Sequence, residues 1–586
     1  MQTFLNMEIL QPSENIQHVL PNLATMLQRN AARFGEKTAY QERKGENYAG
    51  ISWKQLYQNI ETIARRLREI GFEKGSKIVL FSQNRLEMLE LELAVMASGG
   101  IAVPIFANFH HETAELLIRH SDAEWLAVAG FVQLDRIDPK LPLKKIIVFD
   151  FLPDERFDNL LPFKTLLEEM PSGDLIPHTS YLDFNAAPSD ICLNMYTSGT
   201  MGIPKCVQLT HGNILSQQAA LHLLWNLDEN DRFLSYLPWH HSFGGIFELF
   251  TALSNGATYS LESGYGKTPE LIMENWRRVK PTVFFSVPKV YEALVELTKK
   301  SREAEDLFFN SGLKFVFTAA APLPEKMSEE FERRGIPVFE GWGLTETSPC
   351  CTLTDPAVKR QPGVVGNPIP GVSIRIGEEG EIQVRGPNVM VGYYKNDEAN
   401  AGAFTPDGWY RTGDIGDITE TGLKLITRKD RIFKLSNGEK VIPTDMEKLI
   451  EHKCNYISFA VVSGSGEDYP VALLFPNKKL LNNPDYSISP MDGCFCPRNL
   501  EELGRCLQGC LHDANCGIGQ KFAKIKAAAI VDDELSVEKN TLTPSLKLAP
   551  NNVLKAYKVH LENLYGADAP ASEEVYVIRL DGIKSW

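Results

Sequence analysis

Short apolar runs alternate with amphipathic helical periods along the N-terminal half of the chain. A short apolar run between turn residues predicts a buried strand, and apolar residues recurring every three or four positions predict a helix. The predicted strands are 77–82, 100–105, 125–129, 282–286, 314–317 and 337–339, the predicted helices include 85–99 and 112–120, and residues 24–72 form helices around an extended piece at 38–48. This alternation is typical of doubly wound, mostly parallel sheets, so an α/β fold is predicted.

The pattern changes near Gly366. Segments 372–376 and 380–385 alternate apolar and polar residues and are separated by glycine, which favours antiparallel β structure over about 366–428. Beyond Arg428 a helix at 445–452 and strands at 460–462 and 471–475 indicate a smaller α+β segment. The predicted domains are therefore 1–428, which includes the β-rich subdomain, and a mobile C-terminal domain, 429–586.

Length and charge agree with more than one domain and narrow the class of ligand. A chain of 586 residues is too long for a single hydrophobic core. The net charge of −15 disfavours nucleic acid as a partner, because no basic surplus exists to neutralise phosphates. A small anion remains compatible, since local backbone N–H groups and a few lysines suffice to hold it.

No secretory or membrane-spanning segment is indicated. The N-terminus lacks the basic start and unbroken apolar core of a signal peptide. The most apolar early stretch, 93–106, is too short to span a bilayer and contains Gly99, Gly100 and Pro104. A cytoplasmic location is predicted, with peripheral membrane contact left open. The oligomeric state is not indicated.

The ten cysteines are interpreted mainly as thiols, because no secretory signal is present. Five of them lie close together, and a zinc or iron–sulfur site is one interpretation of this cluster. The alternative interpretation is a loop and helix that carry thiols, and the absence of a paired CxxC spacing favours this alternative over a metal site. The five are Cys494, Cys496, Cys506, Cys510 and Cys516.

Residues 196–205, Tyr-Thr-Ser-Gly-Thr-Met-Gly-Ile-Pro-Lys, form a candidate phosphate loop after a short apolar run. The glycines let the backbone approach a polyphosphate, the N–H and O–H groups donate hydrogen bonds, and Lys205 supplies positive charge. The segment is not the common nucleotide P-loop, which needs GxxxxGK[ST]. Taken alone, a segment of this composition is more often an ordinary turn than a phosphate site.

Five further motifs follow in order. They are Thr-Ala-Ala-Ala-Pro-Leu-Pro at 318–324, Glu-Gly-Trp-Gly-Leu-Thr-Glu at 340–346, Gly-Trp-Tyr-Arg-Thr-Gly-Asp at 408–414, Arg-Lys-Asp-Arg-Ile-Phe-Lys-Leu-Ser-Asn-Gly at 428–438, and Leu-Thr-Pro-Ser-Leu-Lys at 542–547. With the phosphate loop, they resemble the motifs of the adenylate-forming superfamily, which includes acyl-CoA synthetases, luciferases and peptide-synthetase adenylation domains. The resemblance covers residues 24 to about 565.

The resemblance implies a site for ATP, Mg²⁺ and a thiol co-substrate. It assigns Mg²⁺ to Thr197 and Glu346, catalysis to Lys205, His241 and Lys547, and the hinge to Asp430. Trp342 takes the place of the aromatic residue that flanks adenine, and Asp414 that of the carboxylate on the ribose. The implied nucleotide contacts are Thr197, Ser198, Gly199, Thr200, Gly202, Lys205, Ala320, Ala321, Glu340, Gly341, Trp342, Gly343, Thr345, Asp414, Arg428 and Lys434.

Each assignment has a physical basis and a plainer alternative. Glu346 offers the oxygen ligands that Mg²⁺ takes, or is a carboxylate at a helix start beside a capping Thr345. Asp414 accepts from the ribose hydroxyls, or is a turn residue. Lys547 neutralises charge developing on the α-phosphate, or is a solvated surface lysine.

The implied reaction has two halves. The acid's carboxylate attacks the α-phosphate of ATP to give acyl-AMP and pyrophosphate, and a thiol such as that of CoA then displaces AMP. Between the halves the C-terminal domain swings about the hinge at Arg428 and Asp430 and withdraws Lys547. Two residues depart from the family pattern, Met201 and Cys206, and weaker phosphate contacts are expected from them. Cys206 is interpreted as a buried, inert thiol rather than a redox-sensitive one.

The acid is predicted to be a medium- or long-chain fatty acid. Residues 237–245 resemble the family segment between phosphate loop and acyl pocket, with His241 at the usual position, although His240 and His241 also fit ordinary hydrogen-bonded histidines. No carboxylate lies in 239–247 before Glu248, which disfavours an amino acid substrate. Segments 286–292 and 341–349 resemble the long-chain fatty acyl-CoA synthetase branch.

Three rival functions remain open. The acyl group of acyl-AMP passes to a carrier-protein thiol rather than to CoA, or enters an oxygenation reaction as in luciferases. Alternatively, the chain is a non-catalytic acyl- or nucleotide-binding protein. The last is disfavoured because Lys205, Glu346, Asp414 and Lys547 are all present.

Overall fold

The computed structural model forms two compact units. The larger unit comprises Met1–Gly199, Ile203–Thr412 and Gly416–Leu425, and the smaller one comprises Thr200–Gly202, Gly413–Ile415 and Ile426–Trp586. The predicted domain boundary after residue 428 stays a prediction. The structure describes residues 8–12, 14–168, 180–197, 204–309, 312–319, 323–481, 497–536, 539–542, 548–566 and 575–580.

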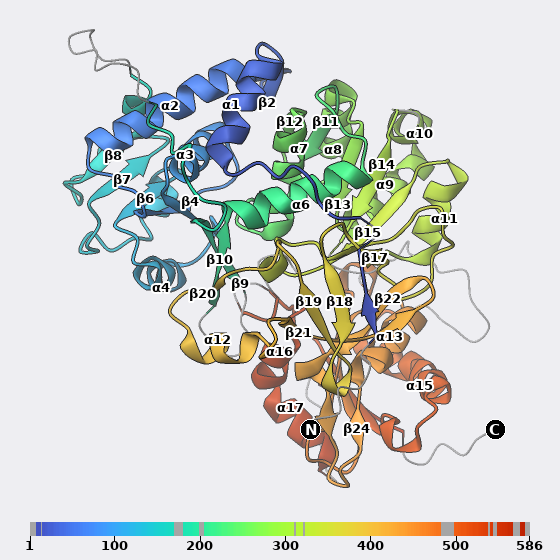
Figure 1. The fold of residues 1–586 in the computed structure, drawn as a ribbon. Coiled ribbons are helices and arrows are strands. Elements are labelled where there is room, and N and C mark those ends of the chain that lie inside the picture. The colour runs from blue at the N-terminus through green and yellow to red at the C-terminus, as the bar shows by residue number, and fades with distance from the viewer. Residues whose placement is uncertain are drawn as a thin grey trace, which may run out of the picture. The chain divides into compact units, whose positions relative to one another are not determined.

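An eight-stranded sheet with the order β20-β10-β9-β5-β4-β6-β7-β8 forms one part of the larger unit (Figure 1). The strands from β9 to β8 run parallel, whereas β10 and β20 are antiparallel to their neighbours. The strands are β4 (Lys77–Phe81), β5 (Ile101–Ile105), β6 (Trp125–Val128), β7 (Lys145–Val148), β8 (Leu160–Pro162), β9 (Ile191–Thr197), β10 (Lys205–Thr210) and β20 (Gly392–Tyr393).

Helices cover both faces of this sheet, as its apolar strands require. Successive residues of β4 point to opposite faces. Leu80 belongs to the same apolar cluster as residues of α3, and Phe81 to a second cluster that contains residues of α4. A strand buried on both sides is a continuous apolar run, which is why the sequence pattern predicted these strands.

A nine-stranded sheet forms the other part of the larger unit, with the order β17-β16-β15-β14-β13-β11-β12-β2-β3. Its strands from β15 to β2 are parallel, and its edges are antiparallel. The strands are β2 (Thr38–Lys44), β3 (Asn47–Ser52), β11 (Arg232–Ser235), β12 (Thr258–Leu261), β13 (Val283–Ser286), β14 (Phe315–Thr318), β15 (Val338–Trp342), β16 (Thr352–Leu353) and β17 (Asn367–Pro368).

The helices of the larger unit pack against these two sheets. Phe285 of β13 lies in the cluster shared with α3 and α7, and Phe284 in the cluster formed with α8 to α11. The helices are α1 (Leu23–Phe34), α2 (Trp53–Glu69), α3 (Leu86–Ala97), α4 (His111–Ser121), α5 (Phe131–Leu134), α6 (His211–Leu224), α7 (Leu249–Asn255), α8 (Pro269–Val279), α9 (Pro288–Lys300), α10 (Arg302–Phe309), α11 (Glu325–Arg333) and α12 (Asp397–Ala403), with short turns η1 (Phe163–Leu166), η2 (Phe243–Glu248), η3 (Thr345–Thr347) and η4 (Glu378–Gly380).

A five-stranded sheet with the order β1-β18-β19-β21-β22 corresponds to the predicted β-rich region. Strands β1, β18 and β19 pair antiparallel, with Ile374 opposite Val384 on the buried face. The strands are β1 (Ile9–Leu10), β18 (Ser373–Ile376), β19 (Glu381–Arg385), β21 (Tyr410–Thr419) and β22 (Gly422–Arg428).

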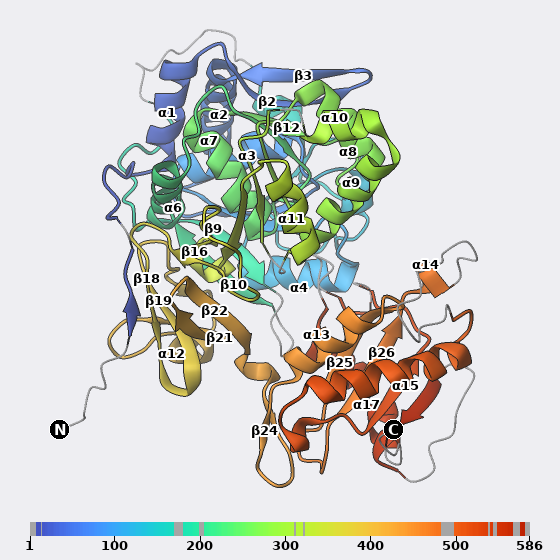
Figure 2. The ribbon, with the colours of Figure 1, turned by 90° about the vertical axis from the view of Figure 1, so that its right-hand side faces the viewer.

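The smaller unit is α+β, with a four-stranded sheet of order β25-β26-β27-β28. Leu474 of β26 packs with α13 and α15, and Leu473 with α16 and α17, so both faces are covered (Figure 2). Its elements are η5 (Lys429–Arg431), β23 (Phe433–Lys434), β24 (Lys440–Val441), α13 (Pro443–Lys453), β25 (Ile457–Ser463), β26 (Val471–Pro476), α14 (Lys478–Leu481), α15 (Leu500–Gly517), η6 (Lys521–Ala523), β27 (Ala527–Val531), α16 (Pro550–Ala556), α17 (Lys558–Tyr565) and β28 (Val575–Arg579).

The predicted fold class is confirmed: parallel α/β sheets, a β-rich part and a smaller α+β unit. Within the described ranges, no helix combines the length and apolar character needed to cross a membrane.

Candidate active site

The two stems of the candidate phosphate loop meet across a β-hairpin. Strand β9 ends at Thr197, β10 begins at Lys205, and these two residues are paired opposite each other. The Thr197 hydroxyl donates to the Lys205 carbonyl oxygen at 3.4 Å. The pairing closes the base of the loop, while Ser198, Gly199, Thr200, Met201 and Gly202 lie outside the described residues.

Cys206 follows the loop on β10 and lies opposite Tyr196. Only 1% of Cys206 is exposed, and burial raises the pKa of its thiol to about 12. A thiol with so high a pKa is protonated at neutral pH and a poor nucleophile. The geometry therefore agrees with the interpretation of Cys206 as an inert thiol.

Lys205 lies against the ring of Tyr393, which belongs to the neighbouring strand β20. The Lys205 Nζ is 4.9 Å from the ring centroid. The Tyr393 hydroxyl donates to Oε1 of Glu346 at 2.9 Å and lies 3.3 Å from the Tyr410 hydroxyl. One buried tyrosine thus joins the lysine of the phosphate loop to the carboxylate predicted to bind Mg²⁺.

Glu346 is fixed at its backbone as well as at its side chain. It lies in the turn η3, and the Met390 N–H donates to its carbonyl oxygen at 2.8 Å. Asn388 donates to the Thr347 carbonyl oxygen at 2.8 Å, and the Ser348 hydroxyl donates back to the Asn388 carbonyl oxygen, also at 2.8 Å. The chain leading into β20 therefore holds the whole turn, and Glu346 remains only 8% exposed.

A hydroxyl contact brings the histidine segment to the same turn. The Ser242 and Thr345 hydroxyl oxygens lie 3.0 Å apart, and Nδ1 of the adjacent His241 accepts from the Phe243 N–H at 3.3 Å. The structure thus places His241 beside a residue that contacts the Glu346 turn. The catalytic role of His241 stays a prediction.

The segment after His241 begins a π-helix, η2, which brings its backbone unusually close to the preceding residues. A Cβ at Gly245 would lie 2.0 Å from the Trp239 carbonyl oxygen, so only glycine fits there. π-Helical turns are frequent at functional sites. The neighbouring His240 packs against Phe106 at 4.9 Å, and burial lowers its pKa to about 4, which keeps the imidazole neutral.

The described residues of the motif 340–346 lie on β15, which ends at Trp342, and just after it. A Cβ at Gly343 would lie 1.8 Å from the Pro349 carbonyl oxygen, so the close backbone approach excludes any side chain. Glu340 forms an ion pair with Arg360, and burial raises the pKa of its carboxyl. Trp342 is 8% exposed. Ala320 and Ala321 lie outside the described residues, and the nucleotide contacts of Glu340, Gly341 and Trp342 stay predictions.

The smaller unit brings together three of its predicted site residues. Arg428 Nη1 forms an ion pair with Oδ1 of Asp414 at 3.0 Å, and Arg428 Nε lies 3.9 Å from Oδ1 of Asp430. Lys434 lies exposed on β23. The predicted catalytic lysine, Lys547, lies outside the described residues.

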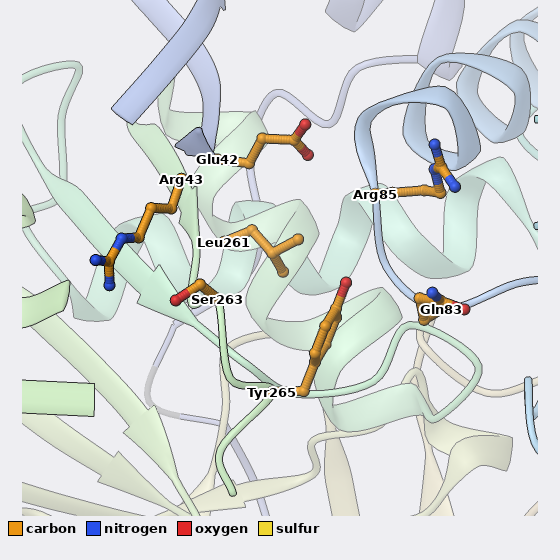
Figure 3. A pocket seen from close by; sticks show the side chains of 7 residues that line it. All are labelled: Glu42, Arg43, Gln83, Arg85, Leu261, Ser263 and Tyr265. Carbon is orange, nitrogen blue, oxygen red and sulfur yellow. The ribbon is translucent and has the colours of Figure 1, made fainter. Parts of the chain in front are cut away.

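A polar pocket of about 240 Å³ lies elsewhere in the larger unit (Figure 3). Figure 3 shows Glu42 and Tyr265 extending into the space between Arg43 and Arg85. Both arginines are already engaged, Arg43 with Glu274 and Arg85 with Asp150 and Glu87. The lining residues are Glu42, Arg43, Gln83, Arg85, Leu261, Ser263 and Tyr265, none of which was predicted as a site residue.

The donor set beside Lys205 fits Mg²⁺ bound together with a polyphosphate. Mg²⁺ is usually held by one or two carboxylates and by the phosphates themselves rather than by an all-protein cage. Glu346 supplies one such carboxylate, and the Thr345 hydroxyl lies on the same turn. In the part of the chain that the structure describes, no group of three or more His, Cys, Asp or Glu side chains is arranged to hold a metal. Cys494 and Cys496 of the predicted cysteine cluster are not in that part, whereas Cys506, Cys510 and Cys516 lie on α15.

Three residues of this arrangement were not predicted from the sequence: Ser242, Tyr393 and Tyr410. Ser242 lay within the quoted histidine segment, and Tyr410 within the motif 408–414. Nothing marked Tyr393, because a tyrosine beside a glycine has no distinctive local chemistry. Only the pairing of β20 with β10 reveals it.

Comparison with known proteins bears on both units. The family of AMP-binding enzymes matches residues 27–394, and the AMP-binding enzyme C-terminal domain matches residues 430–569. Fatty acyl-CoA synthetase A of Dictyostelium discoideum is 26% identical, with 89% of this chain and 86% of that protein covered. Indoleacetate–CoA ligase of Aromatoleum aromaticum is 30% identical, with 73% of this chain and 83% of that protein covered.

Solved structures share the fold at lower identity. The o-succinylbenzoate coenzyme A synthetase MenE of Bacillus subtilis, in complex with ATP and magnesium ion, has a TM-score of 0.71 and 23% identity, with 91% of this chain and 98% of that chain covered. The anthranilate CoA ligase AuaEII, in complex with anthranoyl-AMP, has a TM-score of 0.73 and 20% identity, with 93% and 99% covered. The chain belongs to the AMP-binding enzymes of the adenylate-forming superfamily, which confirms the prediction of an AMP-forming acid:thiol ligase.

Proposed function

We propose that this enzyme converts a medium- or long-chain fatty acid to its acyl-AMP and then transfers the acyl group to CoA. The observation that carries the proposal is the joining of Lys205 and Glu346 through Tyr393 at the base of the phosphate-loop hairpin. A cation for phosphate and a carboxylate for Mg²⁺ at one place are what activation of ATP requires.

The residues divide the work of the first half-reaction. Lys205 would neutralise phosphate charge, and Glu346 and Thr197 would hold Mg²⁺, which when bound would neutralise charge on the phosphate oxygens. Trp342 flanks the adenine and Asp414 accepts from the ribose hydroxyls. The attacking carboxylate is already an anion, so positioning and charge stabilisation carry the catalysis without a general base.

Relatives support the fatty acid and the CoA acceptor. Long-chain-fatty-acid–CoA ligase 6 of Rattus norvegicus and FadD15 of Mycobacterium bovis are each 26% identical, over 89% and 93% of this chain. No carboxylate side chain occurs between Trp239 and Phe247, where a partner for a substrate amine would be expected.

An aromatic acid is the second candidate. The relative with 30% identity is named for indoleacetate. The π-helix also contributes Phe243 and Phe247 to a cluster of rings around Phe317, with centroids 5.6 and 4.7 Å from it. These rings are at most 6% exposed and belong to the core, so the name of the relative is what favours this candidate.

Pyrophosphate release from purified enzyme with ATP, Mg²⁺ and a panel of acids tests the proposal. Fatty acids are expected to support release, and free CoA to yield the thioester. A thioester formed only with a carrier protein would show that the carrier protein, not CoA, is the acceptor. Pyrophosphate release with arylacetic acids alone would show that the substrate is an aromatic acid rather than a fatty acid. No release with any acid would contradict the proposal as a whole.

Half-reactions measured separately test the role of Lys547. We expect Lys547→Ala to block adenylation while leaving thioester formation from supplied acyl-AMP largely intact, because its charge is needed on the α-phosphate. Lys539→Ala is the matched control, because Lys539 lies eight positions earlier in the chain and pairs with Asp533 at 2.6 Å. Equal loss of both half-reactions in Lys547→Ala would contradict this role.

A further inference from the structure

We propose that Tyr393 is a positioning residue that couples the binding of Mg²⁺ to the binding of ATP by holding Lys205 and Glu346 at once. The inference rests on the roles proposed above for those two residues. Tyr393 itself is 5% exposed and lies on β20, outside all the sequence motifs.

Two different parts of the tyrosine make the two contacts. The ring attracts the Lys205 ammonium, whose Nζ lies 4.9 Å from its centroid. The hydroxyl donates to Glu346 Oε1 at 2.9 Å, within the range of O–H···O hydrogen bonds. Each contact depends on a different part of the side chain, so substitutions can remove the two contacts one at a time.

The tyrosine also keeps the two charges apart. The structure records no ion pair between Lys205 and Glu346, both of which it describes, although both contact Tyr393. A direct ion pair would satisfy each charge with the other and leave less for the phosphates and the metal. With one carboxylate oxygen engaged by the hydroxyl, Glu346 is oriented before a ligand arrives.

The backbone of Tyr393 is rigidly held. Its N–H donates to Asn400 Oδ1 at 2.7 Å, and its carbonyl oxygen accepts from Asn400 Nδ2 at 2.8 Å. On the other side, β20 pairs with β10, with Tyr393 opposite Val207. A Cβ at Gly392 would lie 2.9 Å from Asn400 Oδ1, so the clamp depends on a glycine before the tyrosine. The side chain is thus aimed by its strand and by α12.

This arrangement predicts reciprocal coupling. ATP bound at Lys205 would bring its phosphates next to the tyrosine whose hydroxyl holds Glu346, so Mg²⁺ would meet a carboxylate and phosphates together. By linkage, Mg²⁺ must then tighten ATP binding by the same factor that ATP tightens Mg²⁺ binding. Removing the hydroxyl should weaken this coupling, and removing the ring should weaken ATP binding itself.

The neighbouring Tyr394 offers a matched control. Its ring lies 3.9 Å from Lys77 Nζ, and its hydroxyl donates to Asp122 at 2.7 Å. It therefore makes the same two kinds of contact, with residues that are not predicted site residues. Tyr394→Phe removes the hydroxyl that donates to the Asp122 carboxylate, at the position next to Tyr393.

Calorimetric titration of ATP in the absence of acid, with Mg²⁺ or with EDTA, measures the coupling without turnover. In Tyr393→Phe we expect the factor by which Mg²⁺ tightens ATP binding to fall about tenfold, as for loss of one hydrogen bond to a charged group. The affinity for ATP in EDTA should change less than about threefold, because the ring remains. Tyr394→Phe should retain the wild-type factor.

Tyr393→Leu completes the series, because it removes the ring as well. We expect ATP affinity in EDTA to fall a further three- to thirtyfold, as for loss of a partly buried cation–π contact. Far-ultraviolet circular dichroism and the melting temperature show whether this variant folds, and if it does not, Tyr393→Phe alone decides. An unchanged coupling factor in Tyr393→Phe, or an equal loss in Tyr394→Phe, overturns the inference. Wild-type enzyme that binds no ATP would instead overturn the proposed function.

Discussion

Tyr393 and Tyr394 are neighbours in the chain and have nearly the same chemical surroundings. Each has a lysine against its ring and a carboxylate that accepts from its hydroxyl. Tyr393 is the last residue of β20 and reaches Lys205 and Glu346, whereas Tyr394 lies in the turn that follows and reaches Lys77 and Asp122.

The contacts of Tyr393 differ from those of Tyr394 in how deeply they are buried. Glu346 and Tyr393 are buried, at 8% and 5% exposure, whereas Asp122 and Lys395 are exposed. Asp122 also has Lys395 as an ion-pair partner at 2.5 Å, so its charge is satisfied within the protein. An electrostatic contact is stronger in the low dielectric of the protein interior than at the surface. A charged side chain is available to a ligand only where no other side chain already forms an ion pair with it.

The largest expected effect is at the buried carboxylate. Glu346→Gln should lower kcat/KM for ATP by about 10²–10³-fold, because an amide does not replace a carboxylate toward Mg²⁺ and the developing charge. Pyrophosphate release at several Mg²⁺ concentrations measures the loss. Asp122→Asn, the same change beside Tyr394, should stay within about twofold of wild type. Similar losses in the two variants would break the comparison.

The lysines should differ in the same direction. Lys205→Met should lower kcat/KM for ATP by about 10–100-fold, since it removes a charge from the phosphate site. Lys77→Met should have little effect on the same assay, although Lys77 lies closer to its tyrosine ring, at 3.9 Å. An equal loss of kcat/KM in Lys77→Met would contradict the assignment of the phosphate site to Lys205, because Lys77 would then be just as important.

Buried imidazoles should make stability depend on pH. Burial lowers the pKa of His211, 1% exposed, from 6.5 to about 4. Its contribution is complete above pH 6.5 and is lost as pH falls toward 4, because the unfolded chain binds the proton first. The free energy of unfolding should therefore fall by about 1.4 kcal/mol per pH unit in that window.

Urea unfolding followed by tryptophan fluorescence between pH 4.5 and 7.5 measures this slope. His211→Gln should reduce this slope by about 1.4 kcal/mol per pH unit, the contribution of one proton. His18→Gln, the same substitution at an exposed histidine, is the control. A slope unaffected by His211→Gln would show that the folded state tolerates the charged imidazole.

The smallest expected effect is at the exposed carboxylate. Hydrogen bonds from Lys395 and Tyr394 lower the pKa of Asp122, so its contribution exists above about pH 4 and disappears as pH falls through the lowered pKa. Asp122→Asn should cost under about 1 kcal/mol of unfolding free energy, and less at high salt. A cost above about 2 kcal/mol, insensitive to salt, would show that this surface group resembles the buried one.

The sequence predicted the strands of the parallel sheets well, because strands buried on both faces are continuous apolar runs. Residues 77–82 correspond to β4 and 125–129 to β6. The phosphate-loop residues, Glu346 and Asp414 could be named from the sequence, since each stands in a motif with a fixed spacing, and their roles stay predictions. Tyr393 was missed, because its role depends on β20 pairing with a strand far away in the chain.

By itself the sequence determined the fold class, the order of the motifs and the membership of the family, because apolar periodicity and motif spacing are local properties. The tertiary structure decided which of two adjacent tyrosines meets Lys205 and Glu346. That choice follows from the end of β20 at Tyr393, after which the chain turns, and from burial, which sets the strength of each electrostatic contact. Neither quantity is encoded in the residues at 393 and 394 alone.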